Sequence, residues 1–187
     1  MGRWEADAHG RLRLAALELF AERGFEGTTV AHISERAGVT ERTFFRYFPD
    51  KREVLFDGSE ALVHEVVGAI LAAPAERSPF ESACAALAQG GSLFASREFS
   101  RKRSAAIAGN PGLLERELLK MAALSTAISD ALQQRGVSAD EAALAAEAAV
   151  TVFKLAFERW ISLEGAGDFA QCSADVLARF RTLTARP

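Results

Sequence analysis

The stretch TTVAHISERAGVTERTFFRYFPDKR, residues 28–52, decides the fold of the first part of this chain. Its first half is expected to form a short helix, because apolar residues recur at helical spacing behind a capping threonine. These residues are Thr29, Val30, Ile33 and Ala37. Gly38 should end that helix, since glycine reaches the left-handed backbone conformation without a side-chain clash. Thr40 can then cap a second helix, so the stretch predicts a helix, a sharp turn and another helix.

The second predicted helix has two different faces. Phe44 and Phe48 are four residues apart and share the face that would pack against the preceding helix. The opposite face offers two guanidinium groups, a hydroxyl and an aromatic edge, from Arg42, Thr43, Phe45 and Arg46. Arginine can donate two hydrogen bonds to guanine, and an aromatic ring can contact the thymine methyl, so this set suits a DNA major groove. A three-helix bundle with a solvated basic face remains an alternative.

Three segments follow one another in unbroken order: AALELFAERGFEGTTV, ISERAGV and TERTFFRYFPDK. With them, residues 12–55 resemble the DNA-binding domain of the tetracycline-repressor (TetR) family. The resemblance implies a dimeric, ligand-responsive transcriptional regulator, usually a repressor, whose second motif helix enters the major groove. It also implies DNA contacts by position. The implied phosphate contacts are Thr29, Thr43, Tyr47 and Lys51, and the implied base contacts are Glu41, Arg42, Phe45 and Arg46. Thr40, which caps the second helix, is included among the DNA-binding residues.

Length and composition bound the rest of the chain. Its 187 residues, 49% of them hydrophobic, suit one small domain followed by one medium one, which we place at residues 1–55 and 56–187. The net charge of -3 is unevenly spread: residues 1–52 carry +1 and the remainder -4. The basic footprint expected of a DNA-binding protein is therefore local, within residues 42–52.

Cysteine usage and the N-terminus point to a cytoplasmic protein. Cys84 and Cys172 lie far apart, without metal-ligand spacing, and both fall in apolar helical patterns, so buried free thiols are expected. The first ten residues, MGRWEADAHG, contain no long apolar run, and we expect neither a signal peptide nor a membrane anchor.

The pattern of apolar residues, caps and prolines predicts an all-α fold of about nine helices. A loose arm is expected over residues 1–9 and a first helix over 10–23, and one long helix should run from Lys51 to about Ala72 and join the motif to the body. The body is expected to hold five helices. They are placed at residues 79–95, 98–108, 111–135, 139–164 and 168–184. The pair Gly90–Gly91 would permit a kink or close packing.

The predicted helix over residues 139–164 is apolar around most of its circumference, so it needs cover on two sides. One side can face its own domain, and in the TetR family the last two helices form a four-helix dimer interface. The interface residues expected here are Val152, Leu155, Phe169, Cys172, Val176, Phe180 and Leu183. A purely intramolecular helical bundle is the alternative.

A ligand pocket is plausible among the apolar residues of the body, although periodicity cannot distinguish a hollow from a packed core. Its expected lining is Phe94, Phe99, Arg103, Ile107, Leu118, Met121, Leu124, Phe153, Phe157 and Trp160. The segment 101–124, followed by the apolar run that ends in FERW, resembles the TetR branch with an acyl-CoA-like ligand-binding domain. That resemblance implies a bulky amphipathic anion as effector, with Arg101, Lys102 or Arg103 at its head group. A solvated basic face and a neutral hydrophobic ligand are the alternatives.

Three classes of function are compared on this sequence. A ligand-gated DNA-binding regulator accounts for the motif and for the amphipathic C-terminal helices, with double-stranded DNA, a second copy and a small effector as partners and no membrane. An enzyme would need a nucleophile with a base, or a metal cluster, and no such arrangement of residues is seen, so neither catalysis nor a cofactor is expected. A helical protein-interaction module without specific DNA binding is the third class.

Overall fold

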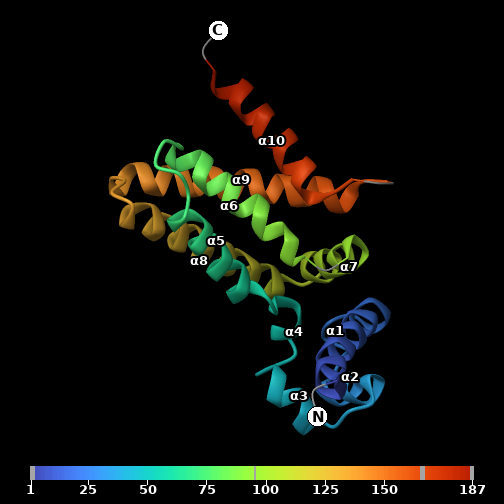
Figure 1. The fold of residues 1–187 in the computed structure, drawn as a ribbon. Helices are drawn as coiled ribbons and strands as arrows, with labels where there is room; N and C mark the ends of the chain where they lie inside the picture. Colours follow the sequence, from blue (N-terminus) through green and yellow to red (C-terminus); the bar gives the residue numbers. More distant parts are fainter. Residues whose placement is uncertain (1–2, 95, 165–166, 186–187) are drawn as a thin grey trace. The chain divides into compact units, whose positions relative to one another are not determined.

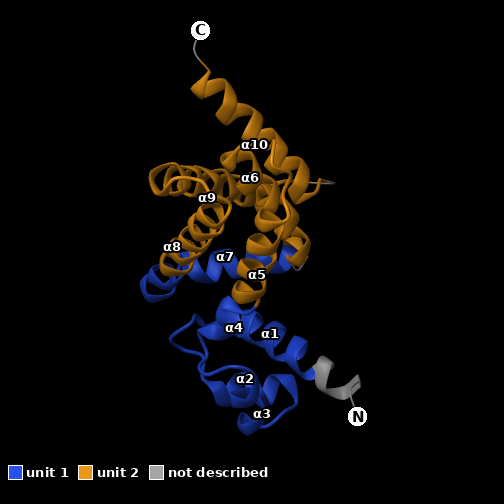
Figure 2. Cartoon of the chain, turned by 60° about the vertical axis from the view of Figure 1, so that its left-hand side comes forward, with its two compact units in different colours: residues 1–57, 98–117 blue, residues 58–97, 118–187 orange. Residues whose placement is uncertain are grey.

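The computed structural model describes residues 3–94, 96–164 and 167–185, with side chains from residue 8 onward. The regular structure of these residues is helical, with ten α-helices and one short 3-10 helix (Figure 1), which confirms the all-α fold class. The chain divides into two compact units, shown in Figure 2. Unit 1 comprises residues 1–57 and 98–117, and unit 2 comprises residues 58–97 and 118–187. A functional division at residue 55 stays a prediction.

Unit 1 contains the helix-turn-helix and a segment from much later in the chain. Its helices are α1 (Arg3–Arg23), α2 (Val30–Ala37), α3 (Glu41–Tyr47), α4 (Glu53–Phe56), most of α7 (Arg97–Ala108) and the first turns of α8 (Pro111–Gln134). One core joins them, because Ile107 and Leu113 are buried among the apolar side chains of α1 to α4. The apolar faces predicted for α2 and α3 are confirmed, since Ile33, Ala37, Phe44 and Phe48 are buried. The buried side of α1 comprises Leu12, Ala16, Leu19 and Phe20.

Two predictions about helix ends in unit 1 are wrong. Helix α1 begins at Arg3, so the loose arm is wrong from that residue onward; Ala8 is buried, and the ring of His9 stacks on that of Phe48, which extends the helix by packing. The long helix over residues 51–72 is instead two helices, α4 and α5 (Ser59–Leu71). Gly58 breaks it with a φ of +88°, a conformation that side-chain-bearing residues rarely adopt.

Unit 2 is a helical bundle built on α9 (Ala139–Ser162), which packs against α6 (Pro79–Gly90) and α10 (Phe169–Thr184). The 3-10 helix Gly91–Leu93 follows α6, and α5 and the rest of α8 complete the unit. Ser78 and Ser138 cap α6 and α9, since their hydroxyls accept hydrogen bonds from the backbone N–H groups of Glu81 and Glu141. Buried alanines on α9 have small side chains, so the neighbouring helices can pack closely against it on several sides. These alanines are Ala142, Ala145, Ala146, Ala149 and Ala156.

Two smaller predictions in unit 2 are also confirmed. Gly91 permits close packing, because a Cβ atom there would collide with the ring of Phe169. Both cysteines are free and buried. Burial raises the pKa of the Cys84 thiol to about 12 and also raises that of Cys172, so neither thiol ionises readily at neutral pH.

Candidate nucleic-acid interface

The ends of α2 are fixed by the residues that the sequence singled out. The Thr29 hydroxyl accepts a hydrogen bond from His32 N at 3.2 Å, while Thr29 N donates to His32 Nδ1 at 3.3 Å. Gly38 adopts φ 65° and ψ 40°, and its N–H satisfies carbonyls of the last turn of α2. The turn that follows can therefore be short, and it sets the angle at which α3 leaves α2.

Helix α3 separates a buried face from an exposed one. Thr40 caps it, its hydroxyl accepting from Thr43 N at 3.2 Å. Phe44 is fully buried and Phe48 nearly so. The four residues implied as base contacts, Glu41, Arg42, Phe45 and Arg46, are all exposed, and the implied phosphate contacts Thr43 and Tyr47 are partly exposed at the side. The structure thus brings these predicted residues onto one accessible surface, although their contacts with DNA stay predictions.

The two arginines of α3 are held differently. Arg46 donates from Nη2 to the Tyr47 hydroxyl at 3.1 Å, and its guanidinium carbon lies 4.9 Å from the centre of the Tyr47 ring. The Arg42 side chain is exposed. Tyr47 therefore orients Arg46, one of the two candidate base-reading groups. No pattern in the sequence indicated this contact, because adjacent residues on a helix do not face each other by spacing.

Lys51 has a role that the sequence did not indicate. Its Nζ donates to the carbonyl oxygens of Phe25 at 2.8 Å and Thr28 at 2.9 Å, and lies 4.2 Å from the centre of the Phe25 ring. Thr28 is itself fully buried, its hydroxyl 2.9 Å from Gly24 O. Two of the three ammonium N–H groups thus hold the loop between α1 and α2, which presents Thr29. The phosphate contact implied for Lys51 stays a prediction.

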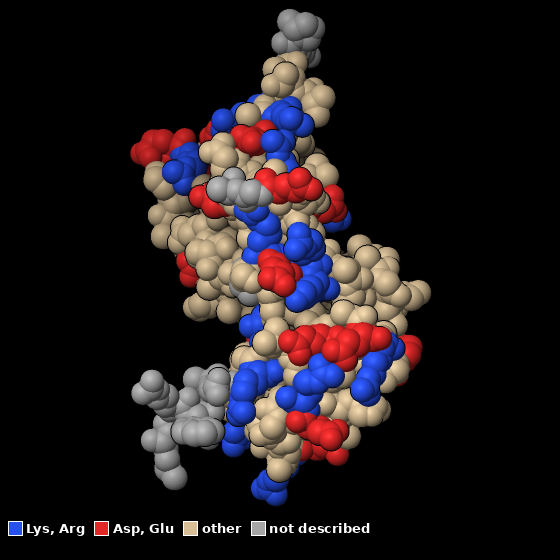
Figure 3. All heavy atoms as spheres, turned by 90° about the vertical axis from the view of Figure 1, so that its right-hand side faces the viewer, with Lys and Arg blue, Asp and Glu red and all other residues tan. Residues whose placement is uncertain are grey.

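The charge around the motif is mixed. Arg36 makes two hydrogen bonds to Glu22, at 3.0 and 2.9 Å, and one to Glu18 at 3.4 Å. The bond from Arg36 lowers the pKa of the exposed Glu22. Figure 3 shows Lys and Arg side chains interspersed with Asp and Glu over one face of the protein. A basic footprint therefore depends on individual exposed cations such as Arg42, in keeping with the local charge predicted from the sequence.

The residues predicted to line a ligand pocket are divided between the units. Unit 1 holds Phe99, Arg103 and Ile107. In unit 2, Leu124 is buried, Met121 is half-buried and Leu118 is exposed. The structure brings together the four remaining aromatic residues, Phe94, Phe153, Phe157 and Trp160, with Phe169, at centroid distances of 5.0–6.2 Å. We call these five residues the aromatic cluster.

Two further observations bear on ligand binding. Arg103 donates from all three guanidinium nitrogens to protein acceptors, Leu55 O and the Glu117 carboxylate, so an anion at Arg103 would have to displace a carboxylate. In unit 1, a surface pocket of about 300 Å³ lies between the ends of α1 and α7. Residues that line it include Phe20, Phe25 and Ala106, and none of its lining belongs to the predicted pocket.

The predicted dimer residues fall into two groups. Val152, Phe169 and Cys172 are buried in the core of unit 2, and Val176 and Phe180 pack partly against that core. Leu155 and Leu183 are exposed, by 50% and 84%. Leu144, which the sequence analysis did not assign to the interface, is 74% exposed and lies three helical turns before Leu155 on the same face of α9.

Comparisons with known proteins agree with a helix-turn-helix motif in this region. Residues 12–57, which cover α2, α3 and α4 and most of α1, match the family model described as bacterial regulatory proteins, tetR family. This part of the chain, the helix-turn-helix region, is similar to the DNA-binding domain of the TetR family. TcmR, an HTH-type transcriptional regulator of Streptomyces glaucescens, is 40% identical over 67 residues, which are 36% of this chain. The match spans only 30% of the length of TcmR.

Solved structures of TetR-family proteins share the fold along nearly the whole chain. One is Thermus thermophilus FadR, a TetR family transcriptional repressor in complex with lauroyl-CoA, with 26% identity, a TM-score of 0.52 and 96% coverage of both chains. Another is a putative TetR-family regulator from Mesorhizobium loti, with 18% identity, a TM-score of 0.56 and 98% coverage of both chains; at that identity the likeness shows the fold alone.

Two kinds of site were also sought among the described residues. No three His, Cys, Asp or Glu side chains of that part of the chain are grouped so that they could hold a metal ion. No helix within residues 3–94, 96–164 and 167–185 is both long and apolar enough to cross a membrane.

Proposed function

We propose that this chain is a ligand-responsive transcriptional repressor that binds a pseudopalindromic operator as a homodimer. The main support for DNA binding is that α3 has one buried and one exposed face. Phe44 anchors the helix in the core, while Arg42, Phe45 and Arg46 are exposed to solvent. An exposed helix after a short turn, with arginine forks and an aromatic edge, matches what a major groove can accept. The match of residues 12–57 to the TetR family model supports the same interpretation.

Sequencing of the DNA fragments that the purified full-length protein retains would test this proposal. One enriched motif with two inverted half-sites is expected, and binding should weaken steeply as salt rises. Arg42→Ala should cost about 1 to 3 kcal/mol on the enriched motif and much less on random DNA. Equal losses on both would show that α3 does not read bases. Complete absence of salt-dependent DNA binding would favour the alternative, a helical protein-interaction module.

The homodimer is supported by the exposed apolar residues of the last two helices. Leu144 and Leu155 leave apolar area uncovered on α9, and Leu183 does so on α10, whereas the buried Val152, Phe169 and Cys172 stabilise the unit itself. Two copies of α3 in successive major grooves would place half-sites about 34 to 36 Å, or a multiple of that, apart. Sedimentation at micromolar concentration should show a dimer that Leu155→Glu dissociates; a wild-type monomer would contradict the proposal.

The effector that we propose is a bulky amphipathic anion, as an acyl-CoA is. The support is the aromatic cluster in unit 2 and the likeness, at 26% identity, to a FadR that was solved with lauroyl-CoA. Arg97 is the cation beside this cluster: its guanidinium donates to Leu163 O and Gly167 O and lies 5.9 Å from the centre of the Trp160 ring. An acyl chain would have to separate rings that now contact each other.

Lauroyl-CoA, dodecanoate and a neutral aromatic compound can be compared for release of the protein from its operator. Release by the two anions is expected, because a ligand shifts the equilibrium only if it binds the DNA-free state more tightly. Arg97→Gln should weaken the response to the anions and leave operator affinity unchanged. Release by the neutral compound alone would exclude an anionic effector without affecting the DNA-binding proposal.

A further inference from the structure

Helix α4 is too short to hold its own position. It spans only Glu53–Phe56, and Arg52, the residue before it, makes no capping hydrogen bond with its side chain. The first turn of a helix is unfavourable in free energy, because it fixes several backbone dihedrals for a single hydrogen bond. A helix of four residues therefore depends on tertiary contacts. Val54, Leu55 and Phe56 are each 2–3% exposed, which anchors α4 to the core of unit 1. Apolar packing alone does not stop α4 from rotating or sliding within this core, whereas directional polar contacts restrict both movements.

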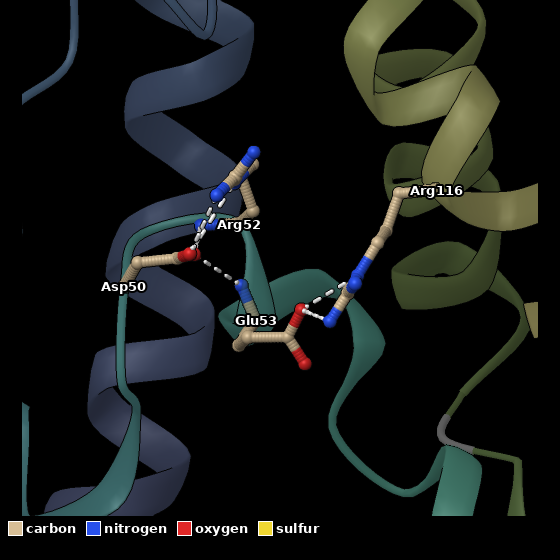
Figure 4. Close-up of polar contacts among 4 residues, drawn as sticks. All are labelled: Asp50, Arg52, Glu53 and Arg116. Carbon is tan, nitrogen blue, oxygen red and sulfur yellow. Dashed lines mark hydrogen bonds and ion pairs between the residues drawn. The ribbon is translucent and has the colours of Figure 1, made fainter. Parts of the chain in front are cut away.

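Two arginines from the segment 98–117 supply such contacts. Arg116, on α8, donates to Glu53 Oε1 from Nε at 2.9 Å and from Nη2 at 2.6 Å (Figure 4). Arg103, on α7, donates from Nε to Leu55 O at 2.5 Å, and its guanidinium carbon lies 5.4 Å from the centre of the Phe56 ring. Glu117 then accepts two hydrogen bonds from Arg103, at 3.2 and 2.7 Å. We call these contacts of Arg103 and Arg116 the α4 clamp.

The α4 clamp differs from an ordinary surface ion pair. Glu53, Arg103 and Glu117 are only 18, 19 and 25% exposed, while Arg116 is 43% exposed; each of the two ion pairs therefore has at least one largely buried partner, and its hydrogen bonds are charge-assisted. By contrast, Lys102 and Glu98 form a pair on α7 whose side chains are 44 and 65% exposed, a setting in which ion pairs contribute little. Removing one partner of a half-buried pair leaves the other desolvated and unpaired, so the clamp should resist rearrangement.

The segment before α4 adds a second constraint on Glu53. The Asp50 carboxylate accepts hydrogen bonds from Arg52 N at 2.7 Å and Glu53 N at 3.1 Å. Figure 4 shows the result: Glu53 is held through its backbone by Asp50 and through its side chain by Arg116. Only residues 48–52 separate α3 from α4, so fixing Glu53 limits how far the C-terminal end of α3 can move.

Chain connectivity gives the clamp a consequence for DNA binding. The chain passes between the two units at three places, after residues 57, 97 and 117, and the last two passages belong to the segment 98–117. The clamp adds to the other contacts between this segment and the N-terminal helices, which are Arg13 over the Phe99 ring, Asn110 with Glu26, and the shared apolar core of unit 1.

We propose that Arg103 and Arg116 are positioning residues for operator binding, which make the helix-turn-helix and the segment 98–117 move as one body. In the homodimer, they would thereby set the separation of the two copies of α3. This inference rests on the proposed function. A charge pair that served only folding would alter affinity for every DNA equally, whereas a positioning pair alters the dependence of affinity on half-site spacing.

The experiment uses the full-length protein, a single half-site, and operators whose half-sites are moved apart in steps of one base pair. Wild type should prefer one spacing. Arg116→Gln and Arg103→Gln should bind the single half-site within about twofold of wild type, but lose roughly tenfold at the preferred spacing, a change of about 1.4 kcal/mol. Lys102→Gln, which breaks the exposed pair with Glu98, is the matched control and should keep the wild-type profile.

A charge swap distinguishes the loss of the ion pair from a general loss of folding. Glu53→Arg combined with Arg116→Glu should restore the spacing preference that each single change removes, with thermal unfolding followed in parallel. An unchanged spacing profile in folded Gln variants would overturn the inference, as would an equal loss on the single half-site and on all operators. A wild-type protein that binds the half-site but shows no spacing preference would instead overturn the dimeric operator binding on which the inference rests.

Discussion

Helices α2 and α3 are fixed mainly by nearby end signals, whereas α4 has one such signal, the Asp50 carboxylate, and is also held by contacts from far along the chain. Thr29, Gly38 and Thr40 satisfy backbone groups at the ends of the first two helices, and all three lie within a few residues of the groups that they serve. The α4 clamp comes from Arg103 and Arg116, about fifty and sixty residues further along the chain. The start of α3 is thus fixed by neighbouring residues, whereas the position of α4, which connects α3 to the rest of the chain, also depends on residues far along the sequence.

The largest effect is expected on the buried face of α3. Phe44 is fully buried, and Phe44→Ala should destabilise the protein by about 3 to 5 kcal/mol, because a cavity replaces the ring. Phe45, its neighbour, is 54% exposed, so Phe45→Ala should leave the free energy of unfolding within about 0.5 kcal/mol of wild type. Denaturant unfolding gives both values. Similar losses for the two variants would show that α3 does not have the two distinct faces described.

Lys51→Met tests whether long-range contacts also hold the loop before α2. The change leaves the carbonyls of Phe25 and Thr28 without their donor, which should cost about 1 to 3 kcal/mol of stability. If the loop contact is its main role, the slope of log affinity against log salt should stay as in wild type. A slope smaller by about one, with stability unchanged, would assign Lys51 to a phosphate instead.

These contrasts explain what the sequence could predict. Periodicity and caps predicted α2, α3 and the starts of α6, α9 and α10, because a cap and the N–H group that it binds are only three residues apart. The predicted bounds of α5 and the predicted end of α6 were wrong. Nothing in the spacing of Arg103 and Arg116 indicated a partner on α4, and Arg103 was assigned to an effector because a basic run beside apolar residues has that appearance. The predicted pocket residues are divided between the two units, and their role in binding a ligand stays a prediction.

The break between α4 and α5 is a local signal that the sequence analysis overlooked. Gly58 has φ +88°, so Gly58→Ala should destabilise the protein by about 1 to 2 kcal/mol. Gly68 is the matched control: it lies within α5, exposed and with no atom within 4 Å of an added Cβ, and Gly68→Ala should stabilise by about 0.5 to 1 kcal/mol. Thermal unfolding of the two variants should shift in opposite directions. A neutral Gly58→Ala would mean that the break does not need a positive φ.

The smallest effect concerns Asp50, the one local contact at the start of α4. Burial alone would raise the pKa of its carboxyl group, but hydrogen bonds from the Arg52 side chain and from the N–H groups of Glu53 and Arg52 outweigh it and hold the pKa below the ordinary 3.8. A lowered pKa in the folded state means that the contribution to stability is present above about pH 4 and is lost as the pH falls through the lowered value. Asp50 is 40% exposed, so after solvent screening the contribution should stay below about 0.5 kcal/mol. Asp50→Asn keeps an oxygen that can accept the two backbone hydrogen bonds but cannot titrate, and it should remove this part of the decline in unfolding temperature between pH 5 and pH 3. An Asn variant that declines as steeply as wild type would show that the start of α4 depends on the clamp and not on its neighbouring carboxylate.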